Sequence, residues 1–330
     1  MPDILIITVV VLALAFDYIN GFHDTANAIA TSVSTRALTP RIAVWLAAGL
    51  NFLGAMYSTG VAKTIGGDIV KSAQMVNSEI IIAAMVGAIF WNLVTWWFCI
   101  PSSSSHALVG GVVGAVLMAK GAEALKAEGI LKIVGSLIFS PIIAMITGFI
   151  IMIALFWLVA RMAPSKINSK FRRMQILSAA MMSFSHGSND AQKAMGIITL
   201  TLVSTGYLST FDVPTWVKMA AAMSMGLGTA AGGWRIIRTM GGKIFKLEPI
   251  SGFSADLNSS FVIFGATLLH LPVSTTHVVS GSIMGVGTAK RLNAVRWGVA
   301  QQMLVAWVLT IPCTALVSGL SYKIIDILFL

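Results

Sequence analysis

The sequence predicts an all-α polytopic membrane protein, and composition, segment length and residue pattern all point to this class. The 330 residues are 57% hydrophobic and only 10% charged, with a mean hydropathy of +0.87. A soluble domain carries roughly a quarter charged residues. Apolar runs near the ~20 residues that span a bilayer as a helix recur along the chain. Because these runs do not alternate apolar and polar residues, a membrane β-barrel is excluded.

The apolar segments form two series on either side of one polar, basic stretch. Residues 1–16 lack a positively charged start, so they are read as a retained membrane helix instead of a signal peptide. Five segments are expected in each half, at 4–35, 42–62, 80–100, 102–119 and 133–160, then at 174–205, 216–234, 253–271, 273–289 and 297–320. The expected domains are a first repeat (1–160), a basic cytoplasmic linker (161–173) and a second repeat (174–330).

Two motifs recur in the same order in both halves, which predicts an internal duplication. Residues 20–28 around Asp24 return in weaker form as 186–194 around Asp190, and Pro-Ser-Ser-Ser-Ser-His at 101–106 returns as Pro-Val-Ser-Thr-Thr-His at 272–277. Five crossings per repeat is an odd number, so the second repeat must enter the membrane inverted. Inverted-topology repeats with broken helices are typical of secondary transporters. The short segments 102–119 and 273–289 are either crossings or halves of re-entrant hairpins.

The charged residues predict the orientation. Fourteen of the 22 Lys and Arg residues fall in connections that share one side, whereas the other side mixes equal numbers of bases and acids. The positive-inside rule puts these basic connections in the cytoplasm and both termini outside the cell membrane. The basic connections carry Arg36, Arg41, Arg161, Lys166, Lys170, Arg172, Arg173, Arg235, Arg238, Lys243, Lys246, Lys290, Arg291 and Arg296, with the acids Glu248 and Asp256. The net charge of +10 is therefore explained without nucleic acid.

The two Ser/Thr-rich motifs predict an anion site. Each follows a proline that ends one helix or starts the next. Helix N-termini present free N–H groups and a positive dipole end, and hydroxyls add donors without charge. The alternative is that these hydroxyls only bond their own helix carbonyls. The expected anion-binding residues are Ser102, Ser103, Ser104, Ser105, Ser274, Thr275 and Thr276, together with Thr25 and Lys193.

The two aspartate motifs predict the place where a coupling cation or proton binds. Carboxylates repel a phosphate, whereas clusters of oxygen ligands suit hard cations. Unwound turns at Gly21 and Gly187 are expected to free backbone carbonyls as further ligands; the alternative is a hydrogen-bond network that only packs helices. Lys193 either replaces a bound cation, faces the substrate or simply neutralises Asp190. The expected coupling residues are Asp24, Asn27, Asn20, Asp190, Asn189 and Gln192.

The remaining polar residues of the apolar segments are assigned supporting roles. The histidines His106, His277, His23 and His186 are expected to orient their neighbours, and no metal or other cofactor is expected. Asp17 is either a supporting partner or a cation ligand. Weak candidates for helix–helix hydrogen bonds are Asn51, Asn92 and Asn258. The cysteines Cys99 and Cys313 have neither metal nor disulfide spacing.

Four stretches in order resemble the PiT family of inorganic phosphate transporters, and most of all its bacterial Pit branch of low-affinity permeases. They are GFHDTANAIAT (21–31), PSSSSHALVGG (101–111), SFSHGSNDAQKAMGIITL (183–200) and PVSTTHVVSGS (272–282). The resemblance covers essentially the whole chain, although Gln192-Lys193 replaces the Ala-Asn of the first copy and the long central loop of many relatives is missing. It implies an inverted-repeat permease that imports phosphate with H+ or Na+, with both motif pairs lining the site, and not an enzyme.

Several alternatives stay open at this point. A sulfate permease or a carrier of divalent metal or metal–phosphate would use similar residues. A Ser–His hydrolase is disfavoured because a catalytic pair needs only one copy of the motif. The expected partners are phosphate, Na+ or H+ and the lipid bilayer, without nucleic acid, and a homodimer is left open.

Overall fold

The computed structural model describes residues 2–233, 236–237 and 239–329, and this part of the chain is nearly all helical and contains no β-strand. The first half contains α1 (Pro2–Ser34), α2 (Pro40–Ala55), α3 (Gly60–Gly67), η1 (Ala73–Met75), α4 (Ser78–Trp97), α5 (Ser104–Lys120), η2 (Ala122–Ala124) and α6 (Ala127–Val159). The second contains α7 (Pro164–Ser204), α8 (Thr215–Ala231), η3 (Thr239–Lys243), α10 (Pro249–Leu268), α11 (Thr275–Lys290), η4 (Leu292–Ala294) and α12 (Trp297–Phe329). The predicted all-α class is confirmed.

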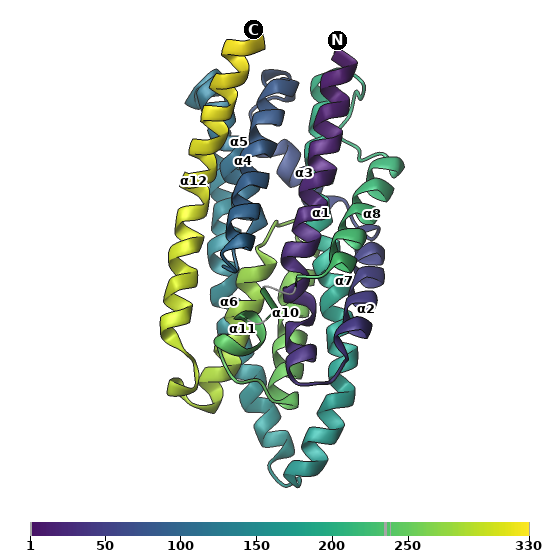
Figure 1. The fold of residues 1–330 in the computed structure, drawn as a ribbon, viewed down its shortest axis with the longest axis vertical. Coiled ribbons are helices and arrows are strands. Elements are labelled where there is room, and N and C mark those ends of the chain that lie inside the picture. Colours follow the sequence, from purple (N-terminus) through teal and green to yellow (C-terminus); the bar gives the residue numbers. More distant parts are fainter. Residues whose placement is uncertain (1, 234–235, 238, 330) are drawn as a thin grey trace.

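The two halves present their helices in a matching order and exchange packing partners. Helix α1 packs on α8 while α7 packs on α2, and α5 packs on α12 while α11 packs on α6. Both termini lie at the same end of the molecule, and the turn between α6 and α7 lies at the opposite end (Figure 1). Helices α1 and α7 therefore run in opposite directions, as an inverted duplication requires.

Glycines allow the exchanged helices to approach closely. A side chain at Gly114 of α5 would collide with the backbone of Ala315 on α12, and one at Gly285 of α11 would collide with that of Met145 on α6. In lipid, helices associate through such small-residue contacts because the hydrophobic effect does not drive helix–helix association there. Glycine thus permits close packing in both the α5–α12 and the α11–α6 contact.

Helices α1 and α7 continue without a break through Gly21 and Gly187, so the prediction of unwound turns there is wrong. A side chain at Gly21 would meet the backbone of Thr229 on α8, and one at Gly187 would meet that of Asn51 on α2. These glycines are needed for close packing against a neighbouring helix and not for a change of backbone direction.

The backbone breaks lie instead in two hairpins, α4–α5 and α10–α11. Their tips, 98–103 and 269–274, meet inside the molecule, where Ser105 Oγ donates to the carbonyl of Val273 at 2.8 Å. Of the two alternatives for the segments 102–119 and 273–289, the structure therefore supports the second, because both segments are second arms of hairpins. A hairpin leaves on the side where it entered, so each half still changes sides an odd number of times.

Fewer of the described helices are long and apolar enough to cross a membrane than the ten segments expected from the sequence. Among the described residues, Ile4–Ser34, Ser78–Trp97, Ala127–Val159 and Trp297–Leu328 are long and apolar enough to span a membrane. Helices α2 and α3 would together form a fifth span, bent by 70°. Helix α7 is longer than any of these, with 41 residues, but its middle is polar.

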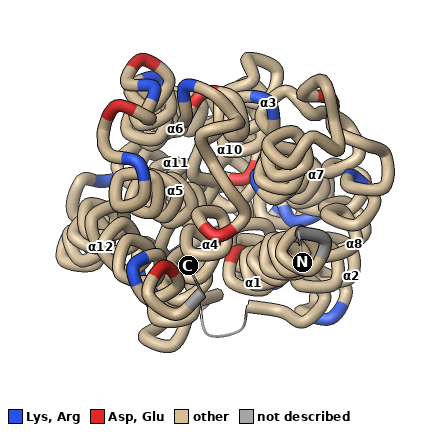
Figure 2. Tube along the Cα trace, turned by 90° about the horizontal axis from the view of Figure 1, so that it is seen from above, with Lys and Arg blue, Asp and Glu red and all other residues tan. Residues whose placement is uncertain are grey.

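Most of the predicted linker is helical. Residues 164–173 form the first turns of α7, and only 160–163 separate α6 from α7. This basic turn lies at the end opposite the termini, as do the α1–α2 and α11–α12 connections (Figure 1). The end that carries the termini mixes Lys and Arg with Asp and Glu (Figure 2). Arg235, Arg238 and Trp234, which the sequence reading placed near this basic end, are outside the described residues.

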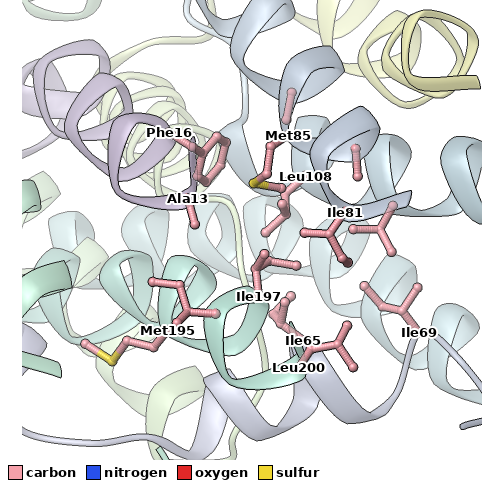
Figure 3. Packing of buried hydrophobic residues seen from close by; sticks show 14 of the residues in the cluster. Ala13, Phe16, Ile65, Ile69, Ile81, Met85, Leu108, Met195, Ile197 and Leu200 are labelled. Atoms are coloured by element: carbon pink, nitrogen blue, oxygen red, sulfur yellow. The ribbon is translucent and has the colours of Figure 1, made fainter. Parts of the chain in front are cut away.

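Two apolar clusters surround the polar centre. One joins α1, α3, α4, α5 and α7, and includes Phe16, Met85 and Leu108 (Figure 3). The other joins residues 26–30 of α1, together with α10 and α11, to α6 and α12. Large apolar side chains such as Trp157 and Val308 are exposed on the outside, as expected of a surface that faces lipid.

Candidate functional site

The two aspartates predicted from the two halves meet at the centre of the molecule. Asp24 on α1 is 2% exposed and Asp190 on α7 is completely buried. Together with His186 they offer ligand atoms that all lie within 4.8 Å of one another. The antiparallel packing of α1 and α7 brings the two motifs to the same level, although they are far apart in the sequence.

Asp24 is linked to both hairpins, to one directly and to the other through His23. Its Oδ1 lies 2.7 Å from His23 Nδ1 and accepts a hydrogen bond from Thr276 Oγ1 at 3.3 Å. The other ring nitrogen of His23 lies 3.2 Å from Thr95 Oγ1 on α4. The carboxylate of α1 is thus linked to the first hairpin through His23 and to the second hairpin through Thr276.

Asp190 has a different set of partners, dominated by a cation. Lys193 Nζ lies 2.9 Å from Asp190 Oδ1, and the two side chains are completely buried. Its Oδ2 accepts from Thr275 Oγ1 at 3.2 Å and from Asn20 Nδ2 at 3.4 Å, and lies 3.6 Å from His186 Nε2. The two carboxylates are therefore not equivalent, because one already has a lysine.

The hairpin tips deliver hydroxyl groups to this centre. Ser103 and Ser274 are the N-caps of α5 and α11, and each accepts from the backbone N–H of the histidine three residues later. The residues that follow the caps turn inward: Ser104 Oγ accepts from Lys193 Nζ at 3.3 Å, and Asn27 Nδ2 donates to Thr275 at 3.3 Å and to Thr276 at 2.9 Å. Two helix N-termini, with their positive dipole ends, thus reach the carboxylates.

The charges of this centre do not balance. Two carboxylates face one ammonium, and burial of a charge costs several kcal/mol unless a partner compensates it. With neutral histidines, one negative charge is left over at Asp24. A cation or proton beside Asp24 removes this excess, and an anion held by the hydroxyls would require further positive charge.

Comparison with known proteins assigns the family. Residues 20–318 match the phosphate transporter family (PHO4). The chain belongs to the phosphate transporter family. A Bacillus subtilis protein described as "Probable low-affinity inorganic phosphate transporter" is 54% identical over 99% of this chain and 98% of its own length. A Rhizobium meliloti protein with the same description is 47% identical over 98% and 97%.

A solved structure agrees with this assignment. A sodium-dependent phosphate transporter, 27% identical, superposes with a TM-score of 0.89 over 98% of this chain and 100% of its own. The chain is therefore a membrane protein of a transporter family, and its relatives are transporters and not enzymes.

Not every predicted site residue of this family member reaches the carboxylates. Ser102 shares a hydrogen bond with Thr310 on α12, and Ser105 bonds the opposite hairpin tip. Thr25 donates to the carbonyl of Gly21 on its own helix, which is the alternative that the sequence left open, and to the carbonyl of Thr229 on α8. These hydroxyls support the hairpins and the helix packing.

Two predicted coupling residues also point elsewhere. Gln192 accepts from the backbone N–H of Ala62 and donates to the carbonyl of Ser188. Asn189 donates to Thr267 and accepts from the backbone N–H of Val273, so it anchors the second hairpin to α7.

His106 and His277 connect the hairpins instead of facing the carboxylates. Their ring centroids are 4.6 Å apart, and His277 stacks on Trp307 of α12 at 3.8 Å. His106 Nδ1 lies 2.8 Å from Ser103 Oγ, the cap of its own helix. The two rings fix the meeting point of the tips.

Two buried polar residues, one of them beside the centre, gave little or no sequence signal. Thr95 is a lone threonine in an apolar run, and nothing in its spacing identifies it. Asp256, which the sequence placed in a basic connection, is buried on α10, where Thr31 donates to it at 2.6 Å. Its position inside the predicted segment 253–271 was the signal that could have identified it as an intramembrane carboxylate.

Proposed function

We propose that the chain imports inorganic phosphate by symport with Na+ or H+, through alternating access to one central site. The observation that carries the proposal is the convergence of Ser104, Thr275 and Thr276 with Lys193 beside the buried pair Asp24 and Asp190. Donors for an oxyanion and carboxylates for a cation thus share one site.

Charge compensation explains the coupling. Phosphate near neutral pH carries between one and two negative charges. Placing this charge next to Asp24 in a low-dielectric interior is unfavourable unless cations or protons enter with it. Cation or proton binding at Asp24 therefore precedes anion binding, and neither moves efficiently without the other.

Alternating access uses the exchanged packing of the two halves. Helix α5 rests on α12 and α11 rests on α6, so each hairpin moves with a helix of the opposite half. One body contains α5 and α12, and the other contains α11 and α6. Rocking of these two bodies about the α1–α7 pair opens the site first to one side and then to the other. With the basic connections in the cytoplasm, the termini end faces the outside of the cell membrane.

The test is phosphate uptake into proteoliposomes, with Na+ and pH gradients imposed separately. We expect an inward gradient of one of the two cations to drive accumulation of labelled phosphate. Uptake that responds to neither gradient would contradict symport. Excess sulfate should not compete, because sulfate has no proton to donate near neutral pH and a site with acceptors for such a proton rejects it; strong competition would favour a sulfate permease.

A second candidate is the transport of phosphate together with a divalent metal. The observation that favours it is the cluster of Asp24, His186 and Asp190, whose ligand atoms lie within 4.8 Å of one another. One imidazole and two carboxylates suit a transition metal better than Na+. Uptake of labelled metal that requires phosphate, measured in the same vesicles, would identify the metal–phosphate complex as cargo.

A further inference from the structure

Asp17 is a buried carboxylate of α1 that the central site does not use. It is completely buried, and neither of its oxygens accepts a hydrogen bond from any residue that the structure describes. Burying an ionised carboxylate without donors or a counter-ion costs several kcal/mol. Its position therefore requires a positive partner.

Lys193 does not fill that role. Lys193 and Asp190, both on α7, are close enough to influence Asp17 electrostatically. The ammonium of Lys193, however, is already bound to Asp190 at 2.9 Å and to Ser104 at 3.3 Å. The charged groups that face Asp17 from α7 are thus already paired with each other.

Two asparagine side chains nearby also have atoms without partners. Asn20 donates to Asp190 with its Nδ2, but its Oδ1 has no partner among the described residues. On Asn92 of α4, neither the nitrogen nor the oxygen of the amide has one. In contrast, Asn51 donates to Thr229 at 2.9 Å and Asn258 to a backbone carbonyl of α6 at 2.7 Å. Asn92 is therefore not a helix–helix bridge of the kind that the other two form.

The register of α1 and α4 places these groups together. His23 Nε2 lies 3.2 Å from Thr95 Oγ1, and Phe16 and Met85, each nearer the start of its helix, belong to one apolar cluster between packed helices (Figure 3). The two helices therefore run side by side in the same direction. Asn20 precedes His23 by three residues and Asn92 precedes Thr95 by three, and residues three apart lie on one face of a helix.

Asn20 and Asn92 therefore lie at the same level of the α1–α4 interface, one turn nearer the termini than the His23–Thr95 contact. Asp17 lies one turn nearer the termini again, three residues before Asn20 on α1. One carboxylate and two amide oxygens then line one buried position. Hard cations prefer oxygen ligands of these types, and one carboxylate balances one positive charge.

We propose that Asp17, Asn20 and Asn92 form a second site, which binds a monovalent, oxygen-coordinated cation such as Na+ on the termini side of the Asp24–Asp190 pair. The amide of Asn20 links the two sites, because its oxygen binds the cation while its nitrogen donates to Asp190. A cation at Asp17 thereby fixes the orientation of Asp190 before the anion arrives. This role in the cycle rests on the proposed function, whereas binding itself does not.

The experiment is equilibrium binding of radioactive Na+ to the purified protein in detergent, without phosphate. We expect the D17N variant to lose one bound ion per chain or to weaken its binding about tenfold or more. The matched control is D256N, which also neutralises a fully buried carboxylate but lies outside the proposed site and should bind Na+ as the wild type does. The Asn92→Asp variant tests the same site by a gain of affinity. It adds a second carboxylate and should therefore bind Na+ more tightly than the wild type.

Equal binding by the wild type and D17N would overturn the proposal, as would weaker binding by Asn92→Asp. Absence of Na+ binding by the wild type would also overturn it and leave a proton on Asp17 as the compensating charge. Competition by Mg2+ that far exceeds competition by K+ would overturn the monovalent assignment. The D24N variant separates the two proposals, because it should lose phosphate uptake and still bind Na+ at the Asp17 site.

Discussion

Lys193 Nζ lies 2.9 Å from Asp190 Oδ1 and 3.3 Å from Ser104 Oγ, in a completely buried position. This ammonium connects α7 of the second half to the hairpin tip of the first. It places an ammonium group where the first half has the neutral Asn27. The two carboxylates of the centre therefore need different amounts of added positive charge.

Replacing Lys193 by Met should destabilise the protein, because Asp190 would be left as an unpaired buried charge. Loss of one member of a buried ion pair costs about 3–5 kcal/mol. We expect a clearly lower Tm in detergent and loss of phosphate uptake.

The double variant K193M/D190N separates the two roles of Lys193. Removing both charges should restore most of the lost Tm. Restored uptake in this variant would mean that Lys193 only neutralises Asp190. Uptake that stays absent while Tm recovers would mean that the Lys193–Asp190 pair has a role in transport beyond mutual neutralisation of its charges.

Asp24→Asn should abolish phosphate uptake and leave membrane insertion intact. The amide keeps the shape of the side chain but removes the negative charge that requires a cation or proton. Uptake in proteoliposomes and the yield of folded protein are the two measurements. Near-normal uptake would remove Asp24 from the coupling mechanism.

Removing one hydroxyl of the anion cradle should raise the KM for phosphate. A hydrogen bond to a charged group contributes about 1.5–3 kcal/mol, so Ser104→Ala or Thr275→Val should raise KM about tenfold or more at unchanged expression. Ser105→Ala is the matched control, since Ser105 belongs to the same motif but bonds the carbonyl of Val273. An equal rise in KM for the control would place the cradle elsewhere.

Gly285→Ala should destabilise the contact between α11 and α6, because the added methyl group would collide with the backbone of Met145. Overpacking of this kind costs about 1–3 kcal/mol. Gly265→Ala, in the same half, meets open space and should leave Tm unchanged. Comparison of the two melting temperatures tests the packing directly, and equal values would show that α11 can shift without cost.

The sequence alone predicted the helical class, the two halves and the meeting of Asp24 with Asp190, because burial of polar groups in lipid restricts where they occur. It also indicated Ser104, Thr275 and Thr276 as candidate anion ligands from their position at helix starts, and these hydroxyls do contact the groups of the centre. Hydroxyls next to them in the same motifs, such as Ser102 and Ser105, were indistinguishable, because side-chain direction depends on how the hairpins pack.

The glycines illustrate a second limit. Gly21 and Gly187 stand beside polar residues, which is also the pattern of an unwound turn. Only the presence of α8 and α2 at their Cα atoms shows why no side chain fits there. Composition likewise could not separate a full crossing from a hairpin arm, since the short apolar segments 102–119 and 273–289, each preceded by a proline, fit either alternative.

The exchange of helices between the halves also affects how the protein is made. The hairpin tip before α5 forms early in synthesis, but its packing surface is α12, which begins only at Trp297. Until that helix leaves the ribosome and inserts, the serines of the first hairpin lack their final support, including the bond from Ser102 to Thr310. Assembly of the centre therefore waits until α12 has been made, and a chain released before α12 has two carboxylates in the membrane but no complete site around them.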